Sequence, residues 1–375
     1  MNCAIFISDV GYGHMVRQRQ IIFNLKKEFK NLKITIFHHK NLPILKKNFG
    51  KSLNYVNNFN NIKLYTTKNG FDKKKTSIIF NSWEKKTNIF LKKKEKSLKK
   101  FDFFISDLVP EISYYAKKNQ KPCFSICHFT WDWFFKKLYK KNLRTTLLMK
   151  KYIKMSTKIY FPPLTFKEIN NDYKKKKEVN FITNKLNKKR SQNFLRKPKK
   201  ILIMNNGTGA LTHCINKIIL NLSSLGKYKF YISTTNVSKK IREKIKEIKN
   251  VFFINNSLKE MYSYISKVDL VVARGGYNTI SECLILGKPS ILSYEYLNPE
   301  VNENIKIMKK NFFCSTMTYK DWENKKFKKK IENFIQKNYY SILNNIIKKK
   351  FKNNGANQIV KDIKKELKLY DQNNR

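Results

Sequence analysis

The stretch from Asp269 to Leu292, DLVVARGGYNTISECLILGKPSIL, constrains the fold more than any other part of the sequence. Its first apolar run predicts a buried strand, Gly275 and Gly276 predict a turn, and the apolar residues that follow are spaced as on one face of a short helix. Gly287 and Pro289 then separate this helix from a second apolar strand. This order of elements predicts half of a doubly wound α/β sheet, with its ligand-binding end at the glycine turn.

The helix that begins after Gly276 is suited to an anion such as a diphosphate. The first N–H groups of a helix have no partner within it, and they lie at the positive end of the helix dipole. Thr279 and Glu282 are three residues apart and therefore share a face, where they could bind phosphate and sugar hydroxyls. The same pattern also fits a plain strand–helix unit whose glycines only form the turn and whose Glu282 is solvated.

The first thirty residues repeat this organisation. A buried-type strand at 3–8 is followed by the turn of Gly11 and Gly13, then by His14 and Arg17 at the start of an amphipathic helix. A third glycine is missing and no acidic residue ends the next strand at 33–38, so a nicotinamide dinucleotide fingerprint is not supported. His14 lies at the mouth of the loop and is the preferred catalytic residue. The other two histidines of this region, His38 and His39, follow a strand end.

The next segments contain a second catalytic candidate and an aromatic cluster. A helical pattern runs from Thr76 to Lys100, and a strand at 103–106 ends in Asp107. The segment HFTWDWFFKKLYKKN, which follows a strand at 123–127, carries six aromatic residues among lysines. Core packing explains some of these rings, whereas an acceptor cleft or a membrane-interface patch could use the others.

The second half restarts the pattern with KKILIMNNGTGAL, in which a strand at 200–204 leads to Gly207, Thr208 and Gly209. Two strand–helix halves joined by a lysine-rich polar segment predict a bilobed α/β protein with a cleft between its lobes. We expect Rossmann-like lobes at 1–165 and 199–355, a basic linker at 166–198 and a C-terminal helix at 356–375.

The formal net charge of +54 is extreme for a 375-residue chain. Only eight of the 80 basic residues are Arg, and Lys, Asn, Ile, Phe and Tyr share A/T-rich codons, which favours genome composition over a dedicated polyanion-binding surface. The field should still attract anionic lipids, nucleotides and nucleic acid at low salt. Because no RNP, KH or helix-turn-helix pattern occurs, no specific nucleic-acid partner is expected.

The cysteines and the chain start predict a cytoplasmic location. Six scattered cysteines lie mostly in apolar runs, as buried thiols of a reducing compartment do. The first residues form a strand rather than a signal peptide, and no apolar run is long enough to span a membrane. A peripheral contact with an anionic membrane, at its inner face, is the further option that the charge leaves open.

Two motifs together resemble a known family. The pattern G-x-G-H-x-x-R, from Gly11 to Arg17, and the pattern G-G-x-x-T-x-x-E-x-x-x-x-G-x-P, from Gly275 to Pro289, resemble the two-Rossmann-lobe (GT-B) glycosyltransferases. Within these, the chain is similar to family 28 and the group of the peptidoglycan N-acetylglucosaminyltransferase. The closer likeness is to the glycosyltransferase-like N-terminal region of L-arabinokinase. The sugar-kinase domain of arabinokinase has no counterpart here, so kinase activity is not carried over.

The resemblance implies a role for each motif residue. The N-terminal lobe would bind the acceptor, with His14 as the base or acceptor-positioning group and Asp107 as a second candidate. The C-terminal lobe would bind the donor. Its implied contacts are with the diphosphate (Gly275, Gly276, Thr279, and Arg274 as the neutralising cation), the ribose hydroxyls (Glu282), a second phosphate-facing turn (Gly207, Thr208, Gly209) and, through a looser match, the donor sugar (Asn302, Glu303).

The implied reaction moves a sugar from a nucleotide sugar, in the first instance a UDP-sugar, to a hydroxyl of a glycan, lipid-linked or small-molecule acceptor. GT-B enzymes need neither a cofactor nor a bound metal, and no DxD pair follows a strand here. Three alternatives stay open: a nucleotide-sugar epimerase or hydrolase of the same fold, a non-catalytic nucleotide-sugar-binding module, and a nucleic-acid binder whose affinity would collapse with salt.

Overall fold

The protein is described by a computed structural model that covers residues 1–10, 13–39, 42–57, 62–67, 70–140, 143–184, 199–204, 218–233, 237, 239–245, 248–254, 258–311, 314–322, 324–336 and 351–373. The chain forms two compact units. Unit 1 comprises residues 1–65, 72–182 and 353–375, and unit 2 comprises residues 66–71 and 183–352. Among the described helices, none combines the length and apolarity that crossing a membrane requires.

Unit 1 is built on a parallel sheet with the strand order β3-β2-β1-β6-β7-β8-β9. The strands are β1 (Asn2–Ile7), β2 (Lys33–Phe37), β3 (Asn54–Val56), β6 (Phe103–Asp107), β7 (Cys123–Ile126), β8 (Lys158–Phe161) and β9 (Lys176–Glu178). The strand order reverses between β1 and β6. In open α/β sheets, ligands bind beyond the carboxyl ends of the strands at such a reversal.

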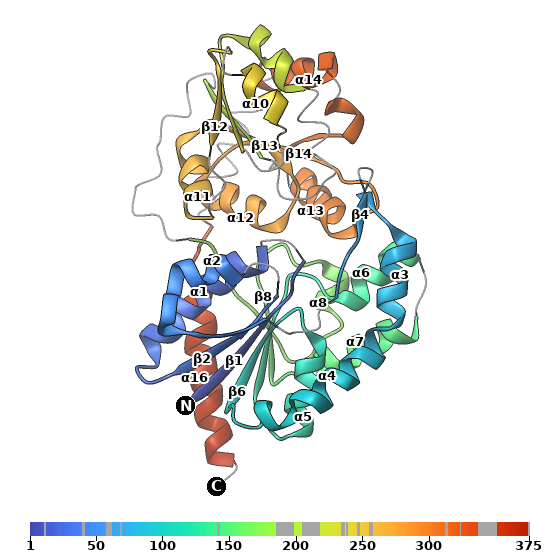
Figure 1. Cartoon of the computed structure of the whole chain (residues 1–375), viewed down its shortest axis with the longest axis vertical. Coiled ribbons are helices and arrows are strands. Elements are labelled where there is room, and N and C mark those ends of the chain that lie inside the picture. Colours follow the sequence, from blue (N-terminus) through green and yellow to red (C-terminus); the bar gives the residue numbers. More distant parts are fainter. Residues whose placement is uncertain are drawn as a thin grey trace. The chain divides into compact units, whose positions relative to one another are not determined.

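Helices cover both faces of this sheet (Figure 1). They are α1 (Gly13–Glu28), α2 (Leu42–Phe49), α3 (Lys73–Asn81), α4 (Trp83–Leu98), α5 (Pro110–Lys118), α6 (Trp131–Tyr139), α7 (Arg144–Lys154), α8 (Lys167–Asn170) and α16 (Gly355–Asn373), with the 3-10 turn η1 (Gly50–Ser52). Apolar residues of α4 and α5 form one core cluster with alternate residues of β1 and β6, among them Phe6 and Phe104. The helical pattern predicted from Thr76 to Lys100 is confirmed, and the structure divides it at Ser82 into α3 and α4.

The C-terminal helix α16 belongs to unit 1, where it lies beside α1 (Figure 1). Its Asp362 accepts a 2.9 Å hydrogen bond from the Tyr160 hydroxyl and pairs with Lys177. Glu366 accepts a 2.6 Å hydrogen bond from Lys158. At the start of the helix, a Cβ atom on Gly355 would lie 2.0 Å from the carbonyl oxygen of Asn180. The close contact between the start of α16 and the backbone of Asn180 therefore requires glycine.

Unit 2 repeats the architecture with a parallel sheet in the order β12-β11-β10-β13-β14-β15. The strands are β10 (Lys200–Met204), β11 (Lys229–Ser233), β12 (Val251–Ile254), β13 (Leu270–Arg274), β14 (Ser290–Ser293) and β15 (Ser315–Met317). An antiparallel hairpin, β4 (Thr66–Thr67) and β5 (Gly70–Phe71), also groups with this unit. Here the strand order reverses between β10 and β13, which places the second reversal beside the turn of Gly275 and Gly276.

The helical elements of unit 2 are η2 (Ile219–Leu225), α10 (Lys239–Ile245), α11 (Leu258–Lys267), α12 (Tyr277–Leu286), α13 (Pro299–Lys310), η3 (Tyr319–Trp322) and α14 (Asn324–Gln336). Alternate strand residues face two separate cores. Ile203 and Val272 pack with η2 and α14, whereas Leu202 and Val271 pack with α11 and α12. The doubly wound α/β architecture predicted from the sequence is confirmed in both units.

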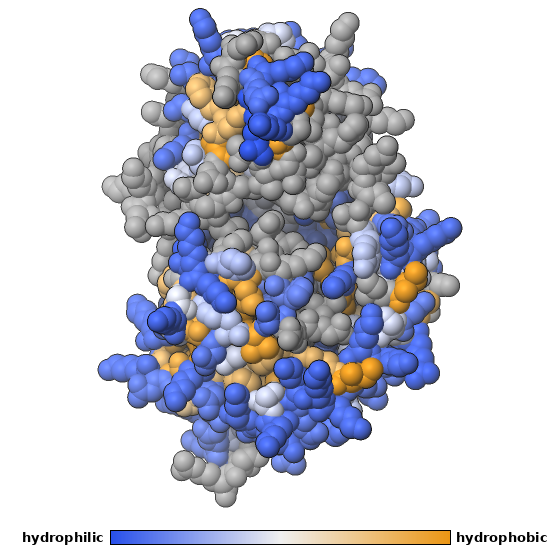
Figure 2. Space-filling model, in the orientation of Figure 1, coloured by the Kyte–Doolittle hydropathy of each residue, from blue (hydrophilic) through white to orange (hydrophobic). Residues whose placement is uncertain are grey.

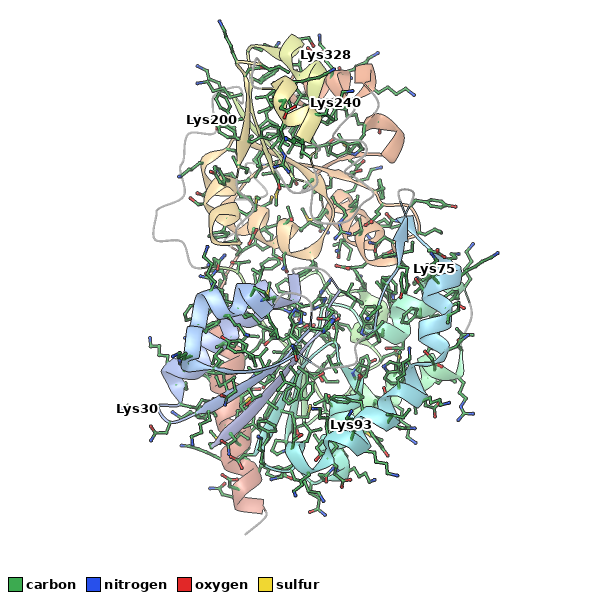
Figure 3. All side chains as sticks on the ribbon, viewed as in Figure 1. Lys30, Lys75, Lys93, Lys200, Lys240 and Lys328 are labelled. Carbon is green, nitrogen blue, oxygen red and sulfur yellow. The ribbon has the colours of Figure 1, made fainter. Side chains whose placement is uncertain are left out.

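Lysines are spread over both units rather than gathered on one element. Of the six labelled in Figure 3, Lys75, Lys93, Lys200, Lys240 and Lys328 come from five different elements and Lys30 from the turn after α1. Figure 2 shows hydrophilic side chains scattered over the visible described surface, with apolar ones between them. Such a distribution agrees with a net charge that arises from overall composition rather than from a single polyanion-binding face.

Candidate active site

The first part of the site lies at the strand-order reversal of unit 1. Asp107 is the last residue of β6, and in the register of the sheet it pairs with Ile7, the last residue of β1. The helix α1 begins six residues after Ile7 and brings His14, Arg17 and Gln18 over the Asp107 carboxylate. Residues separated by about ninety positions therefore meet because β1 and β6 are neighbours.

His14 and Asp107 form a close pair. Nδ1 of His14 lies 2.8 Å from Oδ1 of Asp107. Because a carboxylate only accepts hydrogen bonds, Nδ1 carries the hydrogen and Nε2 keeps the lone pair. A guanidinium nitrogen of Arg17 is also 3.1 Å from Nδ1, but Nδ1 cannot accept from Arg17 while it donates to Asp107. We assign the hydrogen bond to the shorter, charge-assisted contact with Asp107.

Arg17 and Gln18 hold the carboxylate from its other sides. Nε of Arg17 donates to Oδ2 at 3.1 Å, a second guanidinium nitrogen contacts Oδ1, and Nε2 of Gln18 donates to Oδ2 at 2.7 Å. Burial by itself would raise the pKa of Asp107, but Arg17 and His14 outweigh it and hold the pKa well below its ordinary value. Asp107 is thus a fixed anion, too weak a base to take a proton from a hydroxyl.

The two predicted catalytic residues therefore have different capacities. Asp107 is completely buried, whereas His14 keeps 7% of its surface exposed. With Nδ1 bound to Asp107, the ring presents Nε2 as its only basic atom. The pair can accept a proton at Nε2 and stabilise the resulting imidazolium through the carboxylate.

Sequence reasoning missed two members of this cluster. Gln18 follows Arg17 in α1, and His128 follows β7, where its Nδ1 lies 3.4 Å from a guanidinium nitrogen of Arg17. The position of His128, two residues after the end of a strand of the same sheet, is a signal that could have found it. Gln18 carried no such signal, because a glutamine near a helix start is common on solvated surfaces.

The aromatic segment after β7 is part of the core. Trp131 and Phe135 are completely buried, and the indole N–H of Trp131 donates a 2.8 Å hydrogen bond to the carbonyl of Leu108. Trp133 is also buried and donates to Glu168 at 2.9 Å. Of the two alternatives left open for this segment, core packing is therefore confirmed for these three residues of α6.

The second part of the site lies after β13 in unit 2. Gly276 is the N-cap of α12 in extended backbone, and among the described residues a Cβ atom there would meet only the guanidinium of Arg274, at 3.6 Å. Gly275 is different, since its Cβ would lie 2.3 Å from Cγ1 of Ile305 in α13. The first glycine is thus required by packing between the turn and α13, and the second leaves the start of α12 open beside Arg274.

Arg274 is paired within the protein. One guanidinium nitrogen donates a 2.7 Å hydrogen bond to Glu295, whose same oxygen accepts a 2.6 Å bond from Asn298. Burial opposes the charge of Arg274, but the carboxylates of Glu295 and Glu300 outweigh it and raise the pKa above its ordinary value. Nε of Arg274 is buried without a hydrogen-bond partner among the described residues. The side chain therefore keeps one N–H for a further acceptor.

Glu282 and Thr279 lie on the buried side of α12. Burial raises the pKa of Glu282 to about 8, and no cation of the described residues compensates for it. No described side chain is hydrogen-bonded to the Glu282 carboxyl. A buried carboxyl of this kind can both accept and donate a hydrogen bond near neutral pH, as contact with vicinal hydroxyls requires.

The remaining predicted residues are only partly described. Asn302 accepts a 3.1 Å hydrogen bond from the backbone of Glu295, and Glu303 accepts one from Lys306 at 3.2 Å, so both take part in local contacts of α13. Gly13 is the first residue of α1. Gly11, Gly207, Thr208 and Gly209 lie outside the described residues. Within the described ranges, no group of three or more His, Cys, Asp or Glu side chains could hold a metal ion.

Comparison with known proteins finds a similarity in the second half of the chain. Residues 208–367 match the glycosyltransferase family 28 C-terminal domain. No curated protein sequence matches the chain significantly. Solved structures with a similar fold include MurG of Acinetobacter baumannii, which is 12% identical with a TM-score of 0.61, over 97% of this chain and 99% of that one.

Two plant enzymes are also similar in fold. A UDP-glucosyltransferase from Polygonum tinctorium that glucosylates indoxyl is 10% identical with a TM-score of 0.66, and the match covers 98% of each chain. UGT2 of Phytolacca americana, solved with UDP-2-fluoro-glucose and pterostilbene, is 10% identical with a TM-score of 0.64, over 98% of this chain and 99% of that one. The fold shared by these proteins thus extends over both units of the chain.

Proposed function

We propose that the protein is a glycosyltransferase that moves a sugar from a UDP-sugar to a hydroxyl acceptor without a metal ion. The match of residues 208–367 to the glycosyltransferase family 28 C-terminal domain and the fold shared with solved glycosyltransferases support this proposal. Unit 1 supplies the base and the acceptor site, and unit 2 binds the donor. The contact that carries this proposal is the hydrogen bond between His14 and Asp107 at the strand-order reversal of unit 1.

The proton transfer takes place at His14. Nε2 accepts the proton of the acceptor hydroxyl while the oxygen of that hydroxyl forms a bond to the anomeric carbon of the donor sugar. The bond between this carbon and the diphosphate breaks in the same step, and the nucleoside diphosphate leaves with the bonding electrons. Asp107 stabilises the imidazolium. A single displacement of this kind inverts the configuration of the anomeric carbon.

The donor contacts are proposed for unit 2. The start of α12 offers N–H groups and the positive end of a helix dipole to the diphosphate, which reduces the need for a metal ion. The unpaired Nε of Arg274 supports a contact with a phosphate oxygen. The buried carboxyl of Glu282 supports a contact with the ribose hydroxyls. Roles for the turn at 207–209, and for Asn302 and Glu303 at the donor sugar, rest on the family resemblance alone.

Thermal-shift measurements with UDP-, GDP-, dTDP- and CMP-sugars test the donor class. The UDP-glucosyltransferase of Polygonum tinctorium and the UDP-sugar bound to UGT2 support UDP as the nucleotide. We expect stabilisation by UDP-sugars and by UDP, and a smaller shift with Glu282→Ala. A clear shift with another nucleotide only would replace UDP in the proposal.

The role of His14 is tested by two single variants, His14→Gln and Asp107→Asn. Loss of the base should lower kcat by about 10²- to 10⁴-fold, and the thermal shift caused by the donor should stay unchanged. Product analysis separates the alternatives: free sugar or an epimer formed without acceptor indicates a hydrolase or epimerase. Undiminished function of the His14→Gln protein indicates a binding module.

We also propose a peripheral contact of unit 1 with anionic membranes. Three exposed apolar side chains, Ile78 of α3, Ile89 of α4 and Leu147 of α7, lie in lysine-rich helices. Apolar side chains among cations suit the interface of an anionic bilayer. Sedimentation with vesicles of anionic or zwitterionic lipid tests it, with Ile78→Glu/Ile89→Glu as the variant. Equal binding to both vesicle types would contradict the proposed attraction between the lysines and anionic lipid.

A further inference from the structure

A second histidine–aspartate pair lies on the other side of β1. Asp9 comes two residues after the end of β1, and His38 comes directly after β2. In the sheet, β1 lies between β2 and β6. Nδ1 of His38 lies 2.8 Å from Oδ1 of Asp9. His38 is completely buried and Asp9 exposes 4% of its surface. Two buried pairs therefore flank the carboxyl end of one strand, and only the pair of His14 takes part in the proposed reaction.

The hydrogen-bond pattern determines which nitrogen of His38 carries a hydrogen. Nδ1 faces two oxygen acceptors, Oδ1 of Asp9 and the carbonyl of Ile7 at 3.1 Å, so it must be a donor. Oδ1 of Asp9 also accepts a 3.0 Å hydrogen bond from the backbone N–H of His39. Asp9 is thus attached to the end of β2 by a side-chain and a backbone donor.

This attachment lies just before the base. The backbone N–H of Ser8 donates a 3.0 Å hydrogen bond to the carbonyl of Asp107, so Ser8 fixes the chain to β6 while Asp9 fixes it to β2. His14 follows Asp9 by five residues, in the first turn of α1. The position of its ring relative to Asp107 therefore depends on where the chain leaves Ser8 and Asp9.

We propose that Asp9 and His38 are positioning residues for His14, which deepens the proposed function and rests on it. They hold the beginning of the β1–α1 connection so that Nδ1 of His14 meets Asp107. Both partners are buried. Removal of Asp9 takes the charged acceptor from Nδ1 of His38, and removal of the ring takes one donor from the Asp9 carboxylate in a medium of low dielectric, so Ser8 and Asp9 shift at the start of the connection. A displacement of about 1 Å at a catalytic group is enough to cost about 10²-fold in rate.

A competing role would use the other ring nitrogen. Nε2 of His38 is buried and has no hydrogen-bond partner in the described part of the chain. If Nε2 bound a substrate group or passed a proton, that atom would be needed rather than Nδ1. The amide of asparagine replaces the donor at Nδ1 and removes Nε2, whereas the amide of glutamine reaches the position of Nε2 and loses the Nδ1 contact. His38→Asn and His38→Gln are therefore matched and opposite variants.

The kinetic experiment compares these variants with Asp9→Asn, which keeps an acceptor oxygen, and Asp9→Ala, which removes it. Positioning predicts that His38→Asn and Asp9→Asn keep kcat within about 3-fold, and that His38→Gln and Asp9→Ala lower kcat by about 10- to 100-fold. KM for the donor should stay within about 3-fold of the native value, and the donor-induced thermal shift should stay unchanged, since unit 2 is unchanged. The reverse order of the two His38 variants, or equal activity of all four, would overturn the proposal.

A second measurement does not depend on turnover. The chain has five histidines, so ¹⁵N-histidine labelling gives a small set of ring signals, with His14→Gln to assign one of them. We expect the His14 ring to keep its Nδ1–H tautomer in His38→Asn and to lose it in His38→Gln, while near-ultraviolet circular dichroism confirms that both fold. An unchanged His14 signal in His38→Gln would refute the positioning role. Absence of transfer by the native protein with every donor would refute the proposed function alone.

Discussion

Gly275 and Ile305 are in direct contact, because a Cβ atom on Gly275 would lie 2.3 Å from Cγ1 and 2.7 Å from Cδ1 of Ile305. The carbonyl oxygen of Val301 would be 3.2 Å away. The turn after β13 therefore packs against α13 with no room for a side chain. Asn304 adds a 3.1 Å hydrogen bond to the carbonyl of Gly275. Together, the packing of Ile305 and the hydrogen bond of Asn304 hold α13 against the turn that precedes α12.

Gly275→Ala should destabilise unit 2 by about 1–3 kcal/mol, because Ile305 has to leave its position. Gly276→Ala is the matched control, since its Cβ has an ordinary 3.6 Å contact with Arg274. Chemical unfolding measures both. The double variant Gly275→Ala/Ile305→Ala should lose less stability than the sum of its two single variants, because the smaller side chain makes room for the added methyl group. Equal stability of the two alanine variants would show that the turn adapts without cost.

Arg274 and Glu295 should be more costly to separate than to remove together. Arg274→Met or Glu295→Leu alone leaves one buried charge without its partner, with an expected cost of about 3–5 kcal/mol. The double variant should be more stable than either single variant. A double-mutant cycle from urea unfolding checks this, and additive losses would contradict the coupling.

Glu282→Gln should change stability in a pH-dependent way. The folded-state pKa of Glu282 is raised to about 8, so the folded state binds a proton that the unfolded state releases above its pKa of about 4.3. The native protein therefore loses stability relative to the variant as pH rises from about 4.3 to about 8, and the difference is constant above that. Unfolding midpoints between pH 4 and 9 measure it. A difference that shrinks with pH would contradict the buried, uncompensated carboxyl.

Asp362 should be the residue of α16 on which docking depends most. Asp362→Ala leaves the Tyr160 hydroxyl and Lys177 without their acceptor, for an expected loss of about 3 kcal/mol. Glu366→Ala is the control, because its ion pair with Lys158 is more exposed and should contribute less than about 1 kcal/mol. Limited proteolysis near residue 353 and thermal unfolding report the loss. Similar effects of the two variants would place the docking energy in the apolar face of α16 instead.

Local patterns in the sequence were sufficient to predict the strand–turn–helix units on which the site is built. Apolar runs locate β1, β6 and β13, and glycines locate the turns before α1 and α12. The family resemblance added roles for His14, Asp107 and Glu282, which stay proposals. The aromatic residues after β7 could not be assigned from sequence, because rings among lysines fit a core or a surface equally well.

The sequence by itself therefore determined the α/β class, the strand ends at which Asp107 and Arg274 lie and the helix start at which His14 lies, since these depend on local periodicity and turn residues. Only the tertiary structure decided that β6 is the neighbour of β1, which brings Asp107 to His14, and that α13 returns to the turn of Gly275. It also decided that Glu295 neutralises Arg274. Such contacts depend on strand order and on side-chain packing between distant segments, and neither has a period in the sequence.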